Sequence, residues 1–182
     1  MFTEESLKKR ADADVDALIK INSAYWDGDR YKIIKGFCKP GGKILSVGCA
    51  VREPIIIGAT HACDLSPKSG PFLAGNGWRG DFKVASCLKL PYADKSFDIA
   101  VLSEVIEHLP GIAAVIDAMC EISRVAKRFI ITTPNSAKIK PQCQNPNHIL
   151  FFTEEIIKRI IPFKARVYLH DYHIYIEGCD DG

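Results

Sequence analysis

The residues with the clearest chemical potential are a glycine and an acid that each follow a short apolar run. Gly48 comes directly after residues 43–47, and Asp64 follows residues 59–63, sixteen positions further on. A glycine permits a tight turn and a close approach of the backbone to a ligand. A carboxylate can accept hydrogen bonds from the hydroxyl groups of a ribose. Together these two residues are typical of a nucleoside-cofactor site, without indicating which nucleoside it takes.

Polar residues also end two later apolar segments. Ser86 and Cys87 end a segment that begins at residue 82, and Ser103 and Glu104 follow residues 99–102. In an open parallel sheet, a ligand binds beyond the carboxyl ends of the strands, where the strand order reverses. We therefore expect one shared site, built from Gly48, Cys49, Ala50, Asp64, Ser86, Cys87, Ser103 and Glu104.

The elements that must position these residues can be predicted from periodicity. Short apolar runs predict strands at residues 43–48, 59–63, 82–86, 99–102, 128–133, 165–169 and 172–176. Helical spacing predicts two helices within 4–37, broken near 27–29, a helix over 112–125, and one from an N-cap at Thr153 to about residue 160. A short helix after Gly48 is expected to be interrupted by Pro54. The alternation predicts an α/β fold with a doubly wound, mostly parallel sheet that ends in an antiparallel hairpin.

The length and composition suit one soluble globular domain. The chain has 182 residues, of which 47% are apolar and 25% charged. No apolar stretch approaches the roughly 18 residues that a membrane span needs, and the acidic N-terminus has no apolar signal core. A cytoplasmic location is expected. We divide the chain into an N-terminal helical extension, residues 1–38, that forms a cap or lid, and a sheet domain, residues 39–182.

Charge and cysteine usage give little support for nucleic acid or metal as partners. The net charge of +2 is too small to steer nucleic acid or an anionic membrane by itself. The seven cysteines are scattered, odd in number and never spaced as Cys-x-x-Cys, which favours buried thiols. Cys143 and His148 could form half of a zinc site, but no partners with suitable spacing complete it. No metal is predicted.

The segment over residues 90–109 carries a specific resemblance. It contains Leu-Pro-Tyr, then Phe-Asp, an apolar strand, Ser-Glu, and finally Glu-His-Leu after two further residues. This order resembles the segment around strand four of class I S-adenosylmethionine-dependent methyltransferases of the small-molecule branch. Residues 44–50 are similar to the family's glycine loop, and Asp64-Leu65-Ser66 to its ribose acid. Further similar pieces are Thr133-Pro134-Asn135 and His148 with Phe152-Thr153-Glu154-Glu155, so that the resemblance covers about residues 35 to 177.

The resemblance implies a Rossmann-like, seven-stranded sheet with an antiparallel last strand, and S-adenosylmethionine as the cofactor. By position, the loop of Ser46, Gly48, Cys49 and Ala50 would lie beside the methionine portion, and Asp64 would hold the ribose. Leu65 would pack on adenine, and Ser86 and Cys87 would face its edge. Ser103 and Glu104 would line the methionine end and the opening for the acceptor. Tyr25, Trp26 and Tyr31 would form an aromatic lid or belong to the core.

The sequence departs from the family pattern in its glycine loop. Ser46 stands where the family has an acid, Ala50 and Arg52 stand where it has glycines, and Ser86 replaces the acid that meets adenine. Loss of the acid at Ser46 removes a partner for the cofactor ammonium, worth on the order of 1–3 kcal/mol. These departures keep open a second interpretation, in which the chain is a methyltransferase-like binding or regulatory module without activity.

Two histidines are candidate catalytic bases for methyl transfer. An unperturbed imidazole has a pKa near about 6.5, which suits removal of a proton from the acceptor. We expect His108 to share a helical face with Glu104, four residues earlier, and His148 to lie in a loop that closes over the acceptor. The alternatives are that His108 caps its helix or pairs with Glu104, and that His148 is an ordinary loop residue.

The partners follow from the same interpretation. We expect a small-molecule methyl acceptor, with neither nucleic acid nor membrane, and the sequence leaves a homodimer or a partner subunit open. A nicotinamide-dependent dehydrogenase would share the sheet, but its Gly-x-Gly-x-x-Gly pattern after the first strand is absent.

Overall fold

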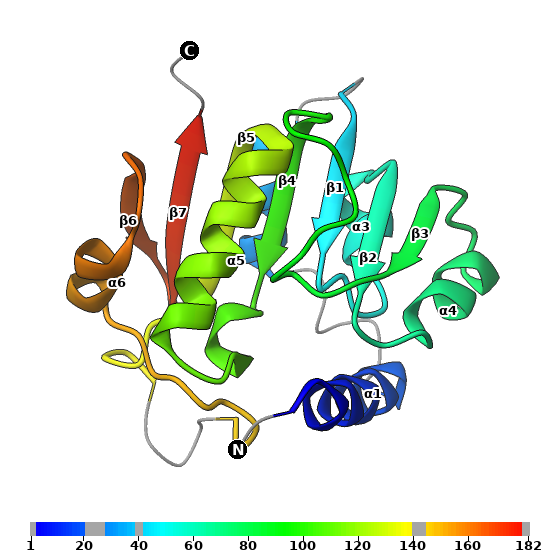
Figure 1. Ribbon diagram of the computed structural model, residues 1–182, viewed down its shortest axis with the longest axis horizontal. Coiled ribbons are helices and arrows are strands. Elements are labelled where there is room, and N and C mark those ends of the chain that lie inside the picture. The colour runs from blue at the N-terminus through cyan, green and yellow to red at the C-terminus, as the bar shows by residue number, and fades with distance from the viewer. Residues whose placement is uncertain (1–2, 21–27, 39–41, 140–144, 180–182) are drawn as a thin grey trace.

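A computed structural model describes residues 3–20, 28–38, 42–139 and 145–179. Its centre is a seven-stranded sheet in the order β3-β2-β1-β4-β5-β7-β6 (Figure 1). All neighbouring strands up to β5 pair in parallel, whereas β7 is antiparallel to both β5 and β6. The strands are β1 (Ile44–Val47), β2 (His61–Asp64), β3 (Asp81–Val84), β4 (Phe97–Ser103), β5 (Ala126–Pro134), β6 (Arg166–His170) and β7 (His173–Cys179). The predicted Rossmann-like sheet with an antiparallel last strand is therefore confirmed.

The strand positions follow from burial. All four residues of β1 are buried, and β4 has one partly exposed residue, as expected for central strands that are covered on both faces. The edge strand β3 is mostly exposed. The predicted hairpin near His170 joins β6 to β7 through Asp171, whose φ is 51°. Within this hairpin, β7 inserts next to β5 and leaves β6 at the edge.

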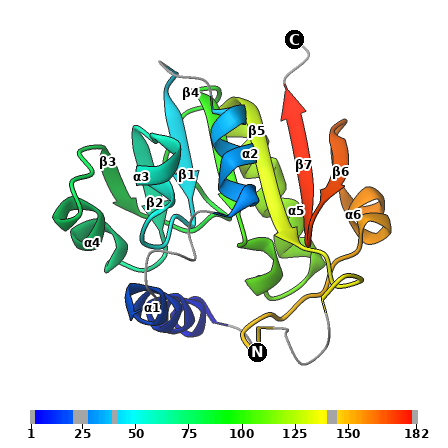
Figure 2. The ribbon, with the colours of Figure 1, turned by 180° about the vertical axis from the view of Figure 1, so that it is seen from behind.

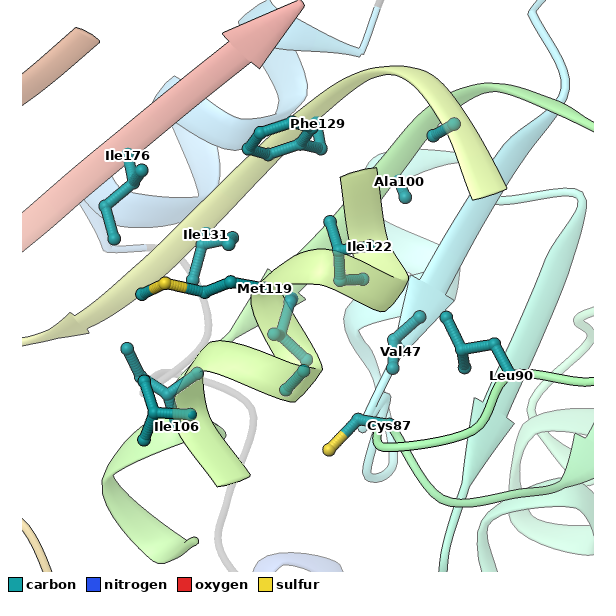
Figure 3. Close-up of a cluster of buried hydrophobic side chains, with 14 of the residues drawn as sticks. Val47, Cys87, Leu90, Ala100, Ile106, Met119, Ile122, Phe129, Ile131 and Ile176 are labelled. Atoms are coloured by element: carbon teal, nitrogen blue, oxygen red, sulfur yellow. The ribbon is translucent and has the colours of Figure 1, made fainter. Parts of the chain in front are cut away.

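Helices cover both faces of the sheet. α5 (Ile112–Val125) and α6 (Glu154–Ile160) pack on one face, and α2 (Asp29–Phe37) and α3 (Glu53–Ile57) pack on the other (Figure 2). α4 (Ser69–Gly75) connects β2 to β3, and a short 3-10 helix, η2 (Ile106–His108), follows β4. Ile122 of α5 packs with residues of β1, β4 and β5 in the larger core cluster (Figure 3).

The first turns of α6 and α3 can be compared with the predictions made for Thr153 and Pro54. Thr153 is the N-cap of α6, where its hydroxyl accepts a hydrogen bond from the Ile156 N–H at 3.3 Å, as predicted. The prediction that Pro54 interrupts a helix is wrong, because Pro54 lies in the first turn of α3. A proline is tolerated there, since its missing N–H would have no partner within the helix.

α1 (Glu4–Lys20) lies beyond the sheet edge at which the parallel strands end (Figure 1). Val15 is its buried residue, and its polar side chains reach the loop after β2. The Ser66 hydroxyl donates a hydrogen bond to Asp12 at 2.6 Å, and Lys68 forms an ion pair with Asp16. Within the described residues, no helix is both long and apolar enough to cross a bilayer. Tyr25, Trp26 and Cys143 lie outside the described residues.

Candidate functional site

A cavity of about 960 Å³ lies at the carboxyl ends of β1, β2 and β4. α1 contributes one wall, and the segment 145–148 contributes another. Ten of the twelve expected site residues line it: Gly48, Cys49, Asp64, Leu65, Ser86, Cys87, Ser103, Glu104, His108 and His148. Ser46 and Ala50 do not. Arg52, which replaces the last glycine of the family pattern, does not line the cavity either, so its long side chain leaves the space open.

Gly48 forms the sharp turn after β1. Its φ is 64°, a left-handed conformation that favours glycine. Its N–H donates to the Cys63 carbonyl at 2.9 Å, which ties the turn to β2. A Cβ at this position would lie 2.4 Å from Cγ2 of Val105. The expected need for glycine therefore has two sources, the backbone conformation and the close approach of Val105.

Asp64 ends β2 and is buried beside this turn. Its two carboxylate oxygens accept the backbone N–H groups of Ala50 and Ser66, each at 2.8 Å. Burial raises the pKa of Asp64 to about 6, although these hydrogen bonds lower it. Ala50, with φ of 47°, thus acts on the site by positioning Asp64 and not by lining the cavity. Leu65 continues the cavity wall from Asp64.

The acid missing from β1 has a counterpart in α3. Ser46 is fully buried, and its hydroxyl donates a hydrogen bond to Oε1 of Glu53 at 2.7 Å. Glu53 is 4% exposed and lines the cavity that Ser46 does not reach. Burial raises the pKa of Glu53 to about 7, against the hydrogen bond from Ser46 and the charge of Arg30. A carboxyl group therefore does lie at this corner of the cavity, supplied by a different residue.

Glu104 lies at the same end of the cavity, next to two basic side chains. Its Oε2 is 3.1 Å from Arg30 Nη1 and 3.5 Å from His173 Nε2, and its Oε1 accepts from Thr132 Oγ1 at 3.0 Å. Burial raises the pKa of Glu104, but Arg30 and His173 outweigh it, so that the pKa lies below its ordinary value. The Nε atom of Arg30 is buried and has no hydrogen-bond partner among the residues that the structure describes.

The two expected bases lie together, but not as predicted. Glu104 has φ of 57° and precedes the 3-10 helix that contains His108, so no shared α-helical face exists. His108 instead packs edge-on against His148, with ring centroids 4.9 Å apart. Burial lowers the pKa of both rings. Glu107, whose side chain is buried, lies beside them, with Oε1 at 3.9 Å from His148 Nε2.

Ser86, Cys87 and Ser103 complete the wall of the cavity. The Ser86 hydroxyl accepts the Leu88 N–H at 3.2 Å, and the Ser103 hydroxyl bonds to that of Thr132 at 2.9 Å. Burial raises the pKa of Cys87 to about 12, so this thiol stays protonated and does not act as a nucleophile at neutral pH.

Comparison with known families adds to this geometry. Residues 45–129 match the family model described as a methyltransferase domain. Over these residues, the chain is similar to a methyltransferase domain. The matched segment contains the Gly48 turn, Asp64, and the strand-four motif that ends at Leu109. α1, α2 and the segment 145–148 lie outside it. No curated protein matches the sequence.

Solved structures share the methyltransferase fold at low sequence identity. A SAM-dependent methyltransferase from Aquifex aeolicus has a TM-score of 0.66 at 18% identity, covering 97% of this chain and 98% of that one. The N-methyltransferase NodS from Bradyrhizobium japonicum, in complex with S-adenosyl-L-homocysteine, has a TM-score of 0.69 at 12% identity and covers 94% and 99%. The 1,6-didemethyltoxoflavin-N1-methyltransferase of Burkholderia thailandensis gives 0.62 at 16% and covers 99% and 92%. These similarities show the fold.

Three further residues of the cavity wall carry charge and were not predicted as site residues. Glu53, Arg30 and Glu107 all line the cavity. Glu107 was quoted within the resemblance but given no role, and Glu53 follows Arg52 directly. The available signal for Glu53 was an acid seven residues after the position that lost one.

Proposed function

We propose that this chain is an S-adenosylmethionine-dependent methyltransferase that acts on a small-molecule acceptor. The observation that carries the proposal is the open cavity at the carboxyl ends of the strands, which keeps a carboxyl group at its β1 corner. A cavity of about 960 Å³ has room for a nucleoside cofactor together with a small acceptor. The lost glycines at Ala50 and Arg52 do not close it.

The cofactor's methionine end is assigned to charged residues. Glu53 would accept hydrogen bonds from the methionine ammonium, in place of the missing acid at Ser46. Arg30, with its unpartnered Nε, would donate to the methionine carboxylate. Both side chains line the cavity beside Gly48, which supports this assignment.

The nucleoside end is assigned to the residues after β2 and β3. Asp64 is buried at the end of β2 and would hold the ribose hydroxyls, for which a carboxylate is suited. Leu65, Ser86 and Cys87 would enclose adenine, since all three line the same cavity. Ser103 and Glu104 would border the reacting methyl group.

Methyl transfer from a sulfonium needs mainly alignment of the two reacting atoms. The acceptor atom forms a bond to the methyl carbon as the carbon–sulfur bond breaks, and neutral S-adenosylhomocysteine leaves. The protein contributes by holding donor and acceptor about 3–3.5 Å apart. At the acceptor end, burial lowers the pKa of His108 and His148, so both rings are neutral at pH 7 and able to accept a proton or bind a cation.

Calorimetric titration with S-adenosylhomocysteine tests the proposal. We expect saturable binding by the unmodified chain and at least about tenfold weaker binding by Asp64→Asn, because one charge-assisted hydrogen bond to the ribose contributes about 1.5–3 kcal/mol. Asp98→Asn is the matched control. Asp98 also accepts a backbone N–H, from Lys43 at 2.8 Å, but it does not line the cavity.

Equal affinity in the Asp64→Asn and Asp98→Asn variants would remove the ribose assignment. No binding by the unmodified chain at millimolar ligand would overturn the proposed function, leaving the alternative of a binding module without activity. Mass spectrometry of the purified protein gives a second readout, since a copurified cofactor or its demethylated product would support binding.

A further inference from the structure

The cavity contains a buried carboxylate oxygen without a hydrogen-bond partner. Glu107 is 1% exposed, and its Oε1 has no partner in the part of the chain that the structure describes. The Nδ1 atom of His108, next in the sequence, is likewise buried without a hydrogen-bond partner there. An unsatisfied buried charged or polar group is costly, so such groups in native proteins commonly mark a missing ligand.

These atoms converge with a third potential ligand. Glu107, His108 and His148 each offer one ligand atom, and all three lie within 4.8 Å of one another. Within this set, His148 Nε2 and Glu107 Oε1 are 3.9 Å apart. Ligand atoms about 2.0–2.2 Å from a tetrahedral ion lie about 3.3–3.6 Å from one another. Small side-chain shifts therefore suffice to close the set around one ion.

The surrounding residues hold this set in place. Glu107 Oε2 accepts a hydrogen bond from Thr133 at 3.0 Å, which leaves Oε1 as the outward oxygen. The Glu107 carbonyl accepts the N–H groups of Ile149 and Leu150, at 2.8 and 3.0 Å, and so fixes the chain just after His148. Thr133 and the two backbone amides are thus the outer partners of this set, whereas Asp14 of α1, 3.9 Å from His108 Nδ1, adds a negative charge next to the ligand atoms. Such outer partners are what orient the ligands of a metal ion.

We propose that Glu107, His108 and His148 bind one divalent transition-metal cation at the acceptor end of the cavity. Two imidazoles and a carboxylate suit zinc, iron or manganese, whereas magnesium prefers oxygen ligands alone. Three protein ligands leave at least one coordination position open, as in catalytic metal sites. All three residues line the cavity, so the open position faces the space for the acceptor.

This inference rests on the proposed function for its consequence. A cation here would bind a hydroxyl of the acceptor and lower the pKa of that hydroxyl. The proton passes to water, the resulting oxygen anion attacks the methyl carbon, and the carbon–sulfur bond breaks to give S-adenosylhomocysteine. The site therefore deepens the proposal to O-methylation of a hydroxyl-bearing small molecule. His108 and His148 act as ligands in this arrangement and not as the bases that the sequence suggested.

Metal binding can be tested without any methyl acceptor. The full chain, stripped with a chelator, is titrated with Zn²⁺ by calorimetry and with Co²⁺ by visible absorption. We expect one ion per chain, and on the order of 10–100-fold or weaker affinity in Glu107→Gln and His148→Ala. His148→Ala is the variant with the lower folding risk, because the side chain lies in an irregular segment.

His170→Ala is the matched control. His170 lies with Asp29 and Asp171 in the second group of potential ligands among the described residues, but this group is exposed. Its removal should leave the affinity for Zn²⁺ unchanged. Failure of the unmodified chain to bind Zn²⁺ or Co²⁺, unchanged affinity in His148→Ala, or loss of binding in His170→Ala would overturn the metal site.

A parallel titration with S-adenosylhomocysteine separates the two proposals. We expect His148→Ala to retain that affinity, because its side chain lies at the acceptor end. Metal binding without S-adenosylhomocysteine binding would contradict the proposed function while keeping the metal site. Binding of S-adenosylhomocysteine without metal binding would contradict the metal site while keeping the proposed function.

Discussion

At the scale of single residues, the cavity contains two carboxyl groups that are expensive to bury. Burial raises the pKa of Glu53 to about 7 and that of Asp64 to about 6. Each is positioned by hydrogen bonds, from Ser46 in one case and from backbone amides in the other. A folded chain that keeps such groups ionised at neutral pH loses stability. The proposed function accounts for their retention, because both groups would contact the cofactor.

Glu53→Gln should therefore stabilise the unliganded protein. Because the folded-state pKa is raised, the contribution of a protonated Glu53 is complete below about pH 4.5 and is lost as pH rises through about 7. At pH 8 the variant avoids this loss, so its free energy of unfolding should rise by up to about 3 kcal/mol. Urea denaturation at pH 5 and pH 8 measures the effect, which should be several-fold smaller at the lower pH.

The same variant should bind S-adenosylhomocysteine at least about tenfold more weakly at pH 8, since a neutral amide replaces a carboxylate facing an ammonium. Glu121→Gln is the control. The hydrogen bond from Arg124 lowers the pKa of Glu121, so that variant should be destabilised and keep its affinity. A Glu53→Gln protein that is less stable at pH 8, or that binds normally, would contradict the role of Glu53.

Site residues could be predicted from the sequence where they lie directly at the end of a predicted strand. Gly48, Asp64 and Glu104 could be located because strand ends place them at one edge of the sheet. Glu53 could not be located in this way, because it lies in α3 and not at a strand end. Its carboxyl group is placed in the site by a tertiary contact, the hydrogen bond from Ser46. Glu107 was missed because the contact of Glu107 with His148 joins segments that are far apart in the sequence.

At the scale of elements, α1 is the part of the site least anchored to the core. Val15 is its buried residue and the partly buried Leu18 packs on the same cluster, whereas Asp12 and Asp16 make polar contacts with the loop after β2. Elements with few buried apolar contacts open at low free energy. We propose that α1 is a lid over the cavity. Periodicity predicted the helix within residues 4–37, but it could not indicate which end of the sheet the helix covers.

Binding of S-adenosylhomocysteine should slow hydrogen exchange in α1. The amides of residues 8–20 are expected to exchange readily in the free protein and at least about tenfold more slowly at saturating ligand, because the bound ligand adds contacts to the inner face of the helix. Mass spectrometry of peptic fragments measures this. α5 serves as an internal control with little change. Protection of other cavity segments without protection of α1 would argue against a lid.

At the scale of the whole molecule, the stabilising core and the ligand cavity are largely separate. Ile122 and Met119 of α5 are fully buried and pack against β5 in the larger core cluster (Figure 3). Neither residue lines the cavity. The sequence predicted this architecture well, since α5 shows helical spacing and β1 and β4 are short apolar runs. The insertion of β7 between β5 and β6 needed the structure, because pairing order is not encoded in periodicity.

Ile122→Ala should lower stability without changing affinity. Truncation of a buried isoleucine leaves a cavity and costs about 2–5 kcal/mol. We expect a lower midpoint of thermal unfolding and an unaltered dissociation constant for S-adenosylhomocysteine at 20 °C or below. A large loss of affinity in a variant that is still folded would mean that the core and the cavity are coupled more strongly than their separation indicates.

The contact between α1 and the segment 145–148 has a kinetic consequence. Asn147 donates a side-chain hydrogen bond to Asp14 at 2.7 Å, and its carbonyl accepts from Arg10 at 2.5 Å. These bonds link two walls of the cavity to each other, although the bonded residues are more than 130 positions apart in the chain. Separation of the two segments would require both hydrogen bonds to break. Under the proposed function, cofactor and acceptor would enter and leave past the same pair of bonds, so that Asn147 would influence the rate of product release.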